Sequence, residues 1–483
     1  MSKSIKRIAF IVTIGTLISK TGGLLRQLVI AGAFGIGSAY DAYNYAYILP
    51  GFFLILLGGI NGPFHNAIVT VLSRKTIQEG KYIANSINTI VSSFLILLSL
   101  FLIIGADPLI TILAPGLTSE VHHIAVFQLQ IMSPITFISG LIGIGFGYLN
   151  VKNEFLIPSI SPIISSLILI ISVSSFWILE KGGLQSSELA LKGGLVLAVA
   201  TLLGAILQFI IQIPSLINNG LSFNKFIFDF KHPGVKEVLN ILGPATFSSG
   251  MLQINVFTDL FFASGIAGAA AGLSYANFII QAPLGLVSNI ILIPLLPSFS
   301  RLSKAENKNE LKIRIRQGLM LSSASMIALA AIFISVGDPI VELIYERGAF
   351  NQEAANLVRK LLIAYSIGMP AYLGRDLLVR VFYALGDAKT PFNLSAIGIW
   401  LNIFFDWFLI GGPSPWGEQL PFNFGTSGIV LATVLINFLT CGALLIKLNL
   451  KLKSIPIKQW LSDLFKLLIS GMFSGLVTWG FHS

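Results

Sequence analysis

The chain has 483 residues, of which 54% are hydrophobic and only 11% are charged, and its mean hydropathy is +0.84. Soluble globular proteins carry about 25% charged residues, so this chain has too few charges to cover a water-facing surface, and a soluble enzyme is excluded. The net charge of +10 does not indicate nucleic-acid binding here, because the basic residues lie at the ends of apolar segments. A single cysteine, Cys441, excludes an intramolecular disulfide and a CxxC metal site.

Apolar segments follow one another along the whole chain, and each is long enough to cross a bilayer as a helix, which takes about 20 residues. They are continuous and do not alternate with polar residues, so we expect an all-α polytopic membrane protein and no barrel. The first segment is too long for a signal peptide. Several others contain Gly or Pro and should be kinked. The predicted spans, about 13 in all, are residues 8–34, 42–72, 85–106, 122–150, 158–180, 190–217, 236–264, 270–300, 312–337, 355–385, 391–411, 424–448 and 460–482.

Lysine and arginine set the orientation of such a protein, because loops rich in them stay in the cytoplasm. With the N-terminus inside, 21 of these residues fall in cytoplasmic loops and at most five outside. We therefore predict a cytoplasmic N-terminus.

The chain also matches itself at an offset of 231 to 236 residues. The matched positions are Pro50 and Pro283, Asp107-Pro108 and Asp338-Pro339, Pro134 and Pro370, Tyr148 and Tyr383, and Pro158 and Pro391. Because each unit holds six spans, the two halves enter the membrane in the same sense, which is a parallel repeat. We expect two six-helix lobes around a central cavity, and a scaffold without a path is the alternative. The predicted parts are an N-lobe (1–217), a cytoplasmic linker (218–235), a C-lobe (236–448) and an extra C-terminal span (449–483).

Ionisable residues inside spans are costly and usually face a cavity or a partner. We predict substrate-binding roles for five of them, which are Lys20, Arg26, Asp41, Arg375 and Arg380. The four cations would suit a diphosphate, since arginine donates bidentate hydrogen bonds. Asp41 would pair with the cations of the first span in one arrangement and release them in another. Alternatively, the cations pair with Asp41 and Asp376 within their own lobes.

A second group offers hard oxygen atoms, the ligands that small cations prefer. Asn402 and Asp406 are four residues apart and share a helix face, and Asp259 and Thr433 would complete the set. We predict that these four residues bind Na⁺, and that the ion would serve as a coupling or structural ion. One protonated carboxyl group bonded to the other is an equally weighted alternative.

The sequence lacks the motifs of ATP-driven or catalytic proteins. The sequence contains no G-x-x-x-x-G-K-[ST] loop, no zinc spacing among its five histidines and no Ser/His/Asp set. We expect no enzyme and no other cofactor.

Three motifs carry a resemblance to a known family. They are Ser19-Lys20-x-x-Gly23-x-x-Arg26 with Asp41-Ala42-Tyr43, then Pro283-Leu284-Gly285 with Leu296-Pro297-Ser298-Phe299-Ser300, and Phe382-Tyr383-Ala384-Leu385-Gly386-Asp387-x-Lys389-Thr390-Pro391. Together they resemble the MurJ (MviN) family of lipid II flippases, in the multidrug/oligosaccharidyl-lipid/polysaccharide exporter superfamily. The sequence departs from the family where arginines are usual, at Leu54 and Phe278, and it has thirteen predicted spans where fourteen are usual.

The resemblance implies that the protein flips lipid II from the cytoplasmic to the outer leaflet of the bacterial inner (plasma) membrane by alternating access. It implies lipid II and membrane lipid as partners, a monomer, a basic pair at Lys20 and Arg26, and a sodium site at the four oxygen-bearing residues given above. The alternatives are a flippase for another lipid-linked oligosaccharide or a cation-coupled multidrug antiporter of the same fold.

Overall fold

The computed structural model describes residues 2–59, 62–180, 187–222, 226–304, 308–412, 423–453 and 455–482. These residues fold into helices, and no strand forms among them beyond an isolated bridge between Ile410 and Asn423. The predicted all-α fold is therefore confirmed. The chain divides into two compact units, residues 1–271 with 347–350 and residues 272–346 with 351–483.

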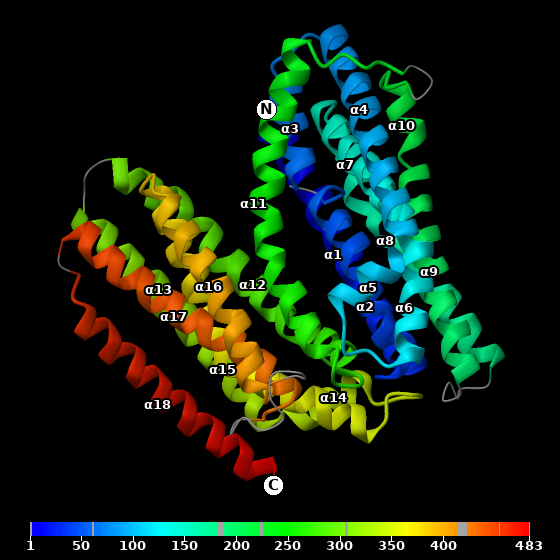
Figure 1. Cartoon of the computed structure of the whole chain (residues 1–483). Helices are drawn as coiled ribbons and strands as arrows, with labels where there is room; N and C mark the ends of the chain where they lie inside the picture. Colours follow the sequence, from blue (N-terminus) through cyan, green and yellow to red (C-terminus); the bar gives the residue numbers. More distant parts are fainter. Residues whose placement is uncertain are drawn as a thin grey trace. The chain divides into compact units, whose positions relative to one another are not determined.

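Unit 1 holds eleven helices among its described residues (Figure 1). They are α1 (Ser2–Phe34), α2 (Ser38–Leu56), α3 (Pro63–Leu72), α4 (Ile77–Ile104), α5 (Ala106–Leu113), α6 (Ser119–Met132), α7 (Pro134–Val151), α8 (Leu156–Leu179), α9 (Ser187–Ile210), α10 (Ile213–Asn218) and α11 (Pro233–Ala263). Within this unit α2 packs against α6, α7 and α9, and α1 lies along α8. The polar residues of α2 are thereby enclosed by helices of the same unit.

Unit 2 contains most of α12 and the helices that follow it. They are α12 (Ala269–Lys304), α13 (Lys308–Ser335), α14 (Gly337–Tyr345), α15 (Gln352–Ala384), α16 (Lys389–Leu409), α17 (Thr426–Leu452) and α18 (Ile457–His482). In this unit α15 packs against α13 and α17, α16 against α17, and α18 against α13. The charged helix α15 is thus packed between α13 and α17.

Nine helical segments of the described chain are long and apolar enough to cross a membrane. The four other predicted spans correspond to α1, α2 with α3, α11 and α15, which carry most of the charged residues singled out in the sequence. The count of 13 spans therefore stays a prediction, whereas the multi-pass membrane character is clear.

Three predicted spans are each divided into two helices, as their Gly and Pro content indicated. The span at 122–150 breaks between α6 and α7, where Pro134 begins the second helix, and the span at 190–217 breaks before Pro214. The span at 42–72 breaks between α2 and α3, and Pro63 begins α3. A proline has no N–H to donate and fits the first turn of a helix, which explains where each second helix starts.

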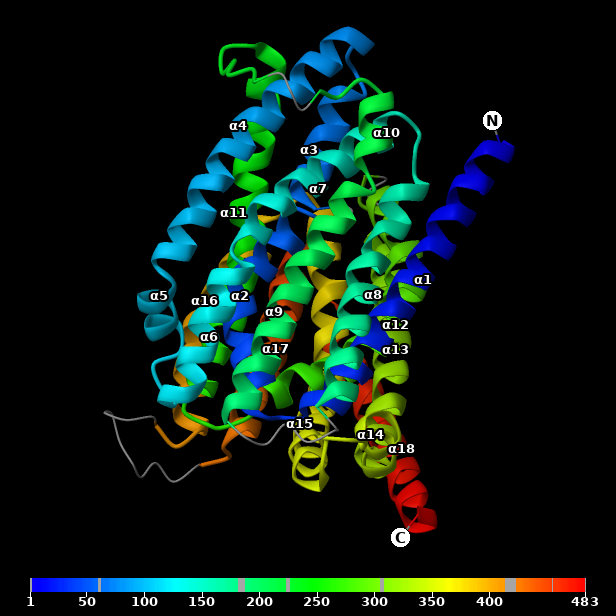
Figure 2. The ribbon, with the colours of Figure 1, turned by 90° about the vertical axis from the view of Figure 1, so that its right-hand side faces the viewer.

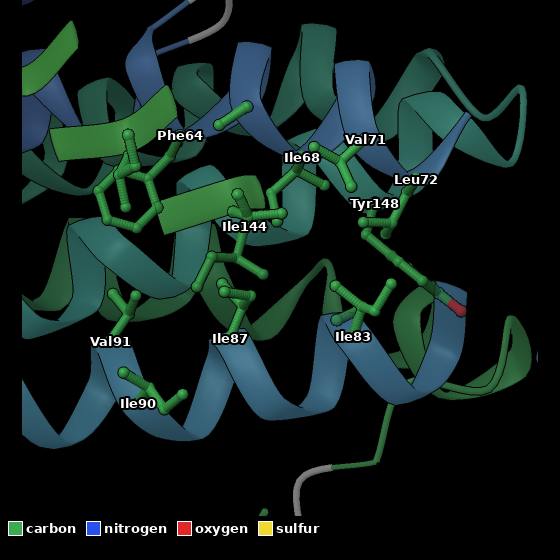
Figure 3. Close-up of a cluster of buried hydrophobic side chains, with 14 of the residues drawn as sticks. Phe64, Ile68, Val71, Leu72, Ile83, Ile87, Ile90, Val91, Ile144 and Tyr148 are labelled. Atoms are coloured by element: carbon green, nitrogen blue, oxygen red, sulfur yellow. The ribbon is translucent and has the colours of Figure 1, made fainter. Parts of the chain in front are cut away.

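The core of unit 1 shows why α11 belongs there. Figure 3 shows Phe64 and Ile68 of α3 packed against Ile87 of α4 and Ile144 of α7. The close approach requires a glycine, because a Cβ on Gly147 would lie 2.8 Å from the Cβ of Ile68. The same cluster includes Val235, Val238 and Leu242 of α11, so this helix buries its first turns in unit 1. The compact units therefore divide after α11, whereas the sequence repeat predicts a boundary before it, and the repeat itself stays a prediction.

Candidate substrate and cation sites

Arg26 lies on α1, half-buried, and its Nε atom is buried without a hydrogen-bond partner in the part of the chain that the structure describes. The guanidinium is close enough to the hydroxyl groups of Tyr43 and Tyr47 on α2 to interact with them electrostatically. Within the described residues Arg26 forms no ion pair. A cation in this position keeps hydrogen-bonding capacity for an anionic ligand. The alternative, an ion pair between Arg26 and Asp41, is not present in this structure.

A row of tyrosines on α2 accompanies this cation. The ring centroids of Tyr43 and Tyr47 are 5.3 Å apart with an interplanar angle of 9°, and those of Tyr40 and Tyr43 are 5.9 Å apart. Two hydrogen bonds fix the row, from Gln27 Nε2 to the Tyr40 hydroxyl (2.9 Å) and between the hydroxyls of Tyr43 and Thr201 (3.0 Å). Sequence reasoning missed these tyrosines, although their spacing of three and four residues along one helix face was a signal.

Lys20 and Asp41 lie in different surroundings from Arg26. Lys20 is exposed on α1. Asp41 is 3% exposed, and its two carboxylate oxygens accept hydrogen bonds from the backbone N–H groups of Gly268 (3.2 Å) and Ala271 (3.0 Å). These donors belong to the loop before α12 and to its first turn, where N–H groups have no partner within the helix. Asp41 therefore caps the start of α12 in this structure and forms no ion pair with Lys20 or Arg26.

In unit 2, the two predicted arginines have partners within the unit. Arg380 pairs with Asp376 at 3.1 Å, one helical turn away on α15. Arg375 donates from Nη1 to Oδ1 of Asn437 on α17 and from Nη2 to the hydroxyl of Ser395 on α16, each at 3.2 Å. For Arg380 the structure thus contains the alternative of pairing within the lobe, and Arg375 ties three helices together. Substrate contact by either residue stays a prediction.

Three of the four predicted cation ligands lie together in unit 2. Asn402 and Asp406 are 1% and 0% exposed, and Asn402 Nδ2 donates to Asp406 Oδ2 at 2.7 Å. The hydroxyl of Thr433 on α17 is 3.5 Å from Asn402 Oδ1. Amide, hydroxyl and carboxylate oxygens are a donor set that fits a hard cation. Asp259 lies on α11, in unit 1, and its place in the ligand set stays a prediction.

The Gly386-Asp387 turn between α15 and α16 explains one family motif. Asp387 accepts hydrogen bonds from Lys451 Nζ (2.6 Å) and from the backbone N–H of Thr390 (3.0 Å). These two bonds lower the pKa of Asp387 to about 2. The motif therefore joins the α15–α16 turn to the end of α17, which is a structural role.

The comparisons with known proteins agree with this architecture. A family model described as lipid II flippase MurJ matches residues 30–483. A probable lipid II flippase MurJ from Synechocystis is 48% identical over 99% of this chain and 88% of its own length. Among solved structures, lipid II flippase MurJ in an inward closed conformation matches with a TM-score of 0.78 and 26% identity, over 97% of this chain and 92% of that one. An inward-facing transporter of the multidrug resistance MATE family, 13% identical, shares the fold with a TM-score of 0.70 over 90% of this chain and 94% of its own. The chain belongs to the MurJ family of lipid II flippases.

Proposed function

We propose that this protein is a lipid II flippase that moves its substrate from the cytoplasmic to the outer leaflet of the bacterial plasma membrane. The observation that carries the proposal is the family match over residues 30–483, together with 48% identity to a relative across nearly the whole chain. A strong excess of basic residues in alternate loops supports a cytoplasmic N-terminus. We expect the protein to act as a monomer.

The physical task is to carry a diphosphate through a hydrocarbon layer about 30 Å thick. A charged group in that layer is costly unless it finds a partner of opposite charge. Arg26 would supply such a partner, because its Nε is buried and has no hydrogen bond to any of the described residues. The polyprenyl chain remains in the lipid, so only the headgroup needs protein contacts. No covalent bond changes in this process, which makes it transport and not catalysis.

Rescue of a bacterial strain depleted of its own lipid II flippase tests the proposal. The protein should restore growth and, in a leaflet-accessibility assay, return lipid II to the outer leaflet. If the protein is present in the membrane at normal levels and lipid II stays on the cytoplasmic side, the proposal is wrong. A parallel assay with another diphosphate-linked oligosaccharide distinguishes the alternative cargo, which carries the same handle.

We also propose that Asn402, Asp406 and Thr433 contribute to a sodium site, with Asp259 as the fourth predicted ligand. The support is the buried cluster of hard oxygen atoms in unit 2. A bound Na⁺ would supply a positive charge beside the Asp406 carboxylate, and the charge moved with each ion is worth about 2.3 kcal/mol per 100 mV of membrane potential.

Replacing Asp406 with alanine should abolish the stabilisation of the purified protein by sodium. A ligand that binds only the folded state raises the free energy of unfolding by about 2.7 kcal/mol at one hundred times its dissociation constant. The melting temperature is measured in sodium chloride and in the chloride of a large organic cation. The wild-type protein should show a sodium-dependent rise, and Asp406→Ala should show none.

Asp376→Asn is the matched control, because Asp376 is a carboxylate of unit 2 that is bound to Arg380 and lies outside the predicted ligand set. It should retain the response to sodium. If the wild type does not respond to sodium but its melting temperature depends on pH in a manner that Asp406→Ala removes, the carboxylate shares a proton and the sodium site is wrong.

A further inference from the structure

The segment that joins α10 to α11 presents three phenylalanines on its outer face. Phe226, Phe228 and Phe230 are 80%, 59% and 55% exposed. The intervening Ile227 and Asp229 are half-buried, so exposure alternates strictly over residues 226–230. These residues belong to no helix. We refer to residues 226–236, which include the first turn of α11, as the aromatic linker.

Hydrogen bonds to α4 explain the alternation. The backbone N–H of Ile227 donates to the Thr89 hydroxyl (3.2 Å), and that of Asp229 donates to the Ser86 hydroxyl (3.4 Å). In an extended chain successive side chains point to opposite sides. With this backbone fixed on α4, the three phenylalanines point away from the helix.

The end of the linker is also fixed. Asp229 accepts hydrogen bonds from the backbone N–H groups of Lys231 and His232, each at 3.0 Å, and from the Tyr82 hydroxyl at 2.9 Å. The hydrogen bond from Tyr82 holds the pKa of Asp229 below its usual range. The exposed phenylalanines therefore belong to a defined structure.

The position of the linker along α4 indicates where the linker lies relative to the membrane. It passes the N-terminal part of this helix (Figure 1) and lies beside residues 82–89. The apolar span predicted for α4 begins at residue 85, and the candidate span is Ile77–Ile104. One to two turns further along, Phe94 is 65% exposed, as expected for a lipid-facing side chain. The view in Figure 2 also places the linker at the end of unit 1 where α4 begins. The linker thus lies where α4 passes from its polar start to its apolar span.

Basic residues flank the phenylalanines. Lys231 and Lys236 are exposed, whereas the two acids nearby in the sequence are less accessible: Asp229 is engaged by three donors and Glu237 is half-buried. Basic residues beside a membrane span are attracted to anionic lipids of the cytoplasmic leaflet. Aromatic side chains favour the boundary between headgroups and acyl chains.

We propose that the aromatic linker is a membrane anchor that inserts Phe226, Phe228 and Phe230 into the cytoplasmic interface of the bilayer and binds anionic phospholipid through Lys231 and Lys236. The occupant of this surface is lipid, because the apolar side chains lie at the membrane boundary and the exposed charges beside them, those of Lys231 and Lys236, are positive. This role is independent of the transported substrate.

Spin labelling in vesicles tests the insertion. In a Cys441→Ser background, a nitroxide at Phe228→Cys should collide readily with oxygen and poorly with a water-soluble nickel complex. A label at Phe94→Cys gives the pattern of a lipid-facing site. Gln78 is exposed in the first turn of α4, and a label at Gln78→Cys gives the pattern of a water-exposed site. If the Phe228 label behaves as the Gln78 label does, the proposal is wrong. Low collision rates with both reagents would mean that a protein surface covers the linker, which also contradicts it.

A second measurement tests the anionic lipid. The oxygen-to-nickel accessibility ratio at position 228 should rise about twofold or more when neutral phosphatidylcholine vesicles receive about 30% phosphatidylglycerol, since each basic residue adds attraction. The Lys231→Gln, Lys236→Gln double variant should lose this rise and keep the ratio measured in neutral vesicles. An equal rise in the variant, or none in the wild type, would contradict binding through these lysines.

Discussion

Replacing Arg26 with glutamine is expected to abolish rescue of a flippase-depleted strain while leaving the protein folded. The guanidinium carries a buried Nε without a hydrogen bond and pairs with no acid among the described residues. Its removal should therefore change the stability of the protein little, whereas the substrate diphosphate would lose a positively charged partner. A hydrogen bond to a charged group is worth about 1.5–3 kcal/mol, which corresponds to a loss of about tenfold to more than a hundredfold in binding or rate. The measurements are growth, and the rate at which lipid II reaches the outer leaflet.

Two further variants give this result its meaning. Arg74→Gln makes the same substitution at an exposed position at the end of α3 in unit 1, and it should support normal growth. Arg26→Lys keeps the charge without the planar fork and should retain part of the rate. Membrane levels and melting temperature must match those of the wild type. Full rescue by Arg26→Gln would show that Arg26 is not a substrate ligand.

The fold was predictable because it depends on properties that are local in the sequence. Apolar length determines which segments become helices, and prolines such as Pro63 and Pro134 mark the start of a helix after a break. The sequence could not assign α11 to a compact unit, since that depends on whether Val235 and Val238 pack against the core around α3 and α4.

The candidate sites were predictable only in part. Asn402 and Asp406 come together because their spacing of four residues fixes their relation on α16. Arg375 finds Asn437 and Ser395 on two other helices, and no local pattern identifies such partners. The partners of Asp41 are backbone groups more than 220 residues away, and a backbone N–H leaves no signature in the sequence. For this reason the sequence alone could not distinguish an ion pair between Asp41 and the first span from a helix cap formed by Asp41.

Replacing Asp41 with alanine is expected to destabilise the protein strongly. The substitution leaves the N–H groups of Gly268 and Ala271 without their acceptor in a buried place. Each buried donor without a partner costs about 1–3 kcal/mol, and the first turn of α12 also loses a negative charge that its dipole favours. Asp41→Asn should be milder, because its amide oxygen can accept one of the two hydrogen bonds. The expected order of melting temperature is wild type, then asparagine, then alanine.

A double-mutant cycle separates the helix cap from the ion pair predicted from the sequence. If Asp41 acts as a cap on α12, its substitution by asparagine and that of Arg26 by glutamine should change the free energy of unfolding additively, within about 0.5 kcal/mol. If the two residues exchange charge during transport, their effects on the ratio of inward-open to outward-open populations should be coupled, because removing Arg26 takes away one of the two first-span cations that Asp41 would release. Crosslinks that report inward-open and outward-open populations give the independent measurement. A residue shifts a conformational equilibrium only if its interactions differ between the two states. If the effects on the free energy of unfolding are additive and Asp41→Asn leaves the ratio of the two populations unchanged, the role of Asp41 is to cap α12.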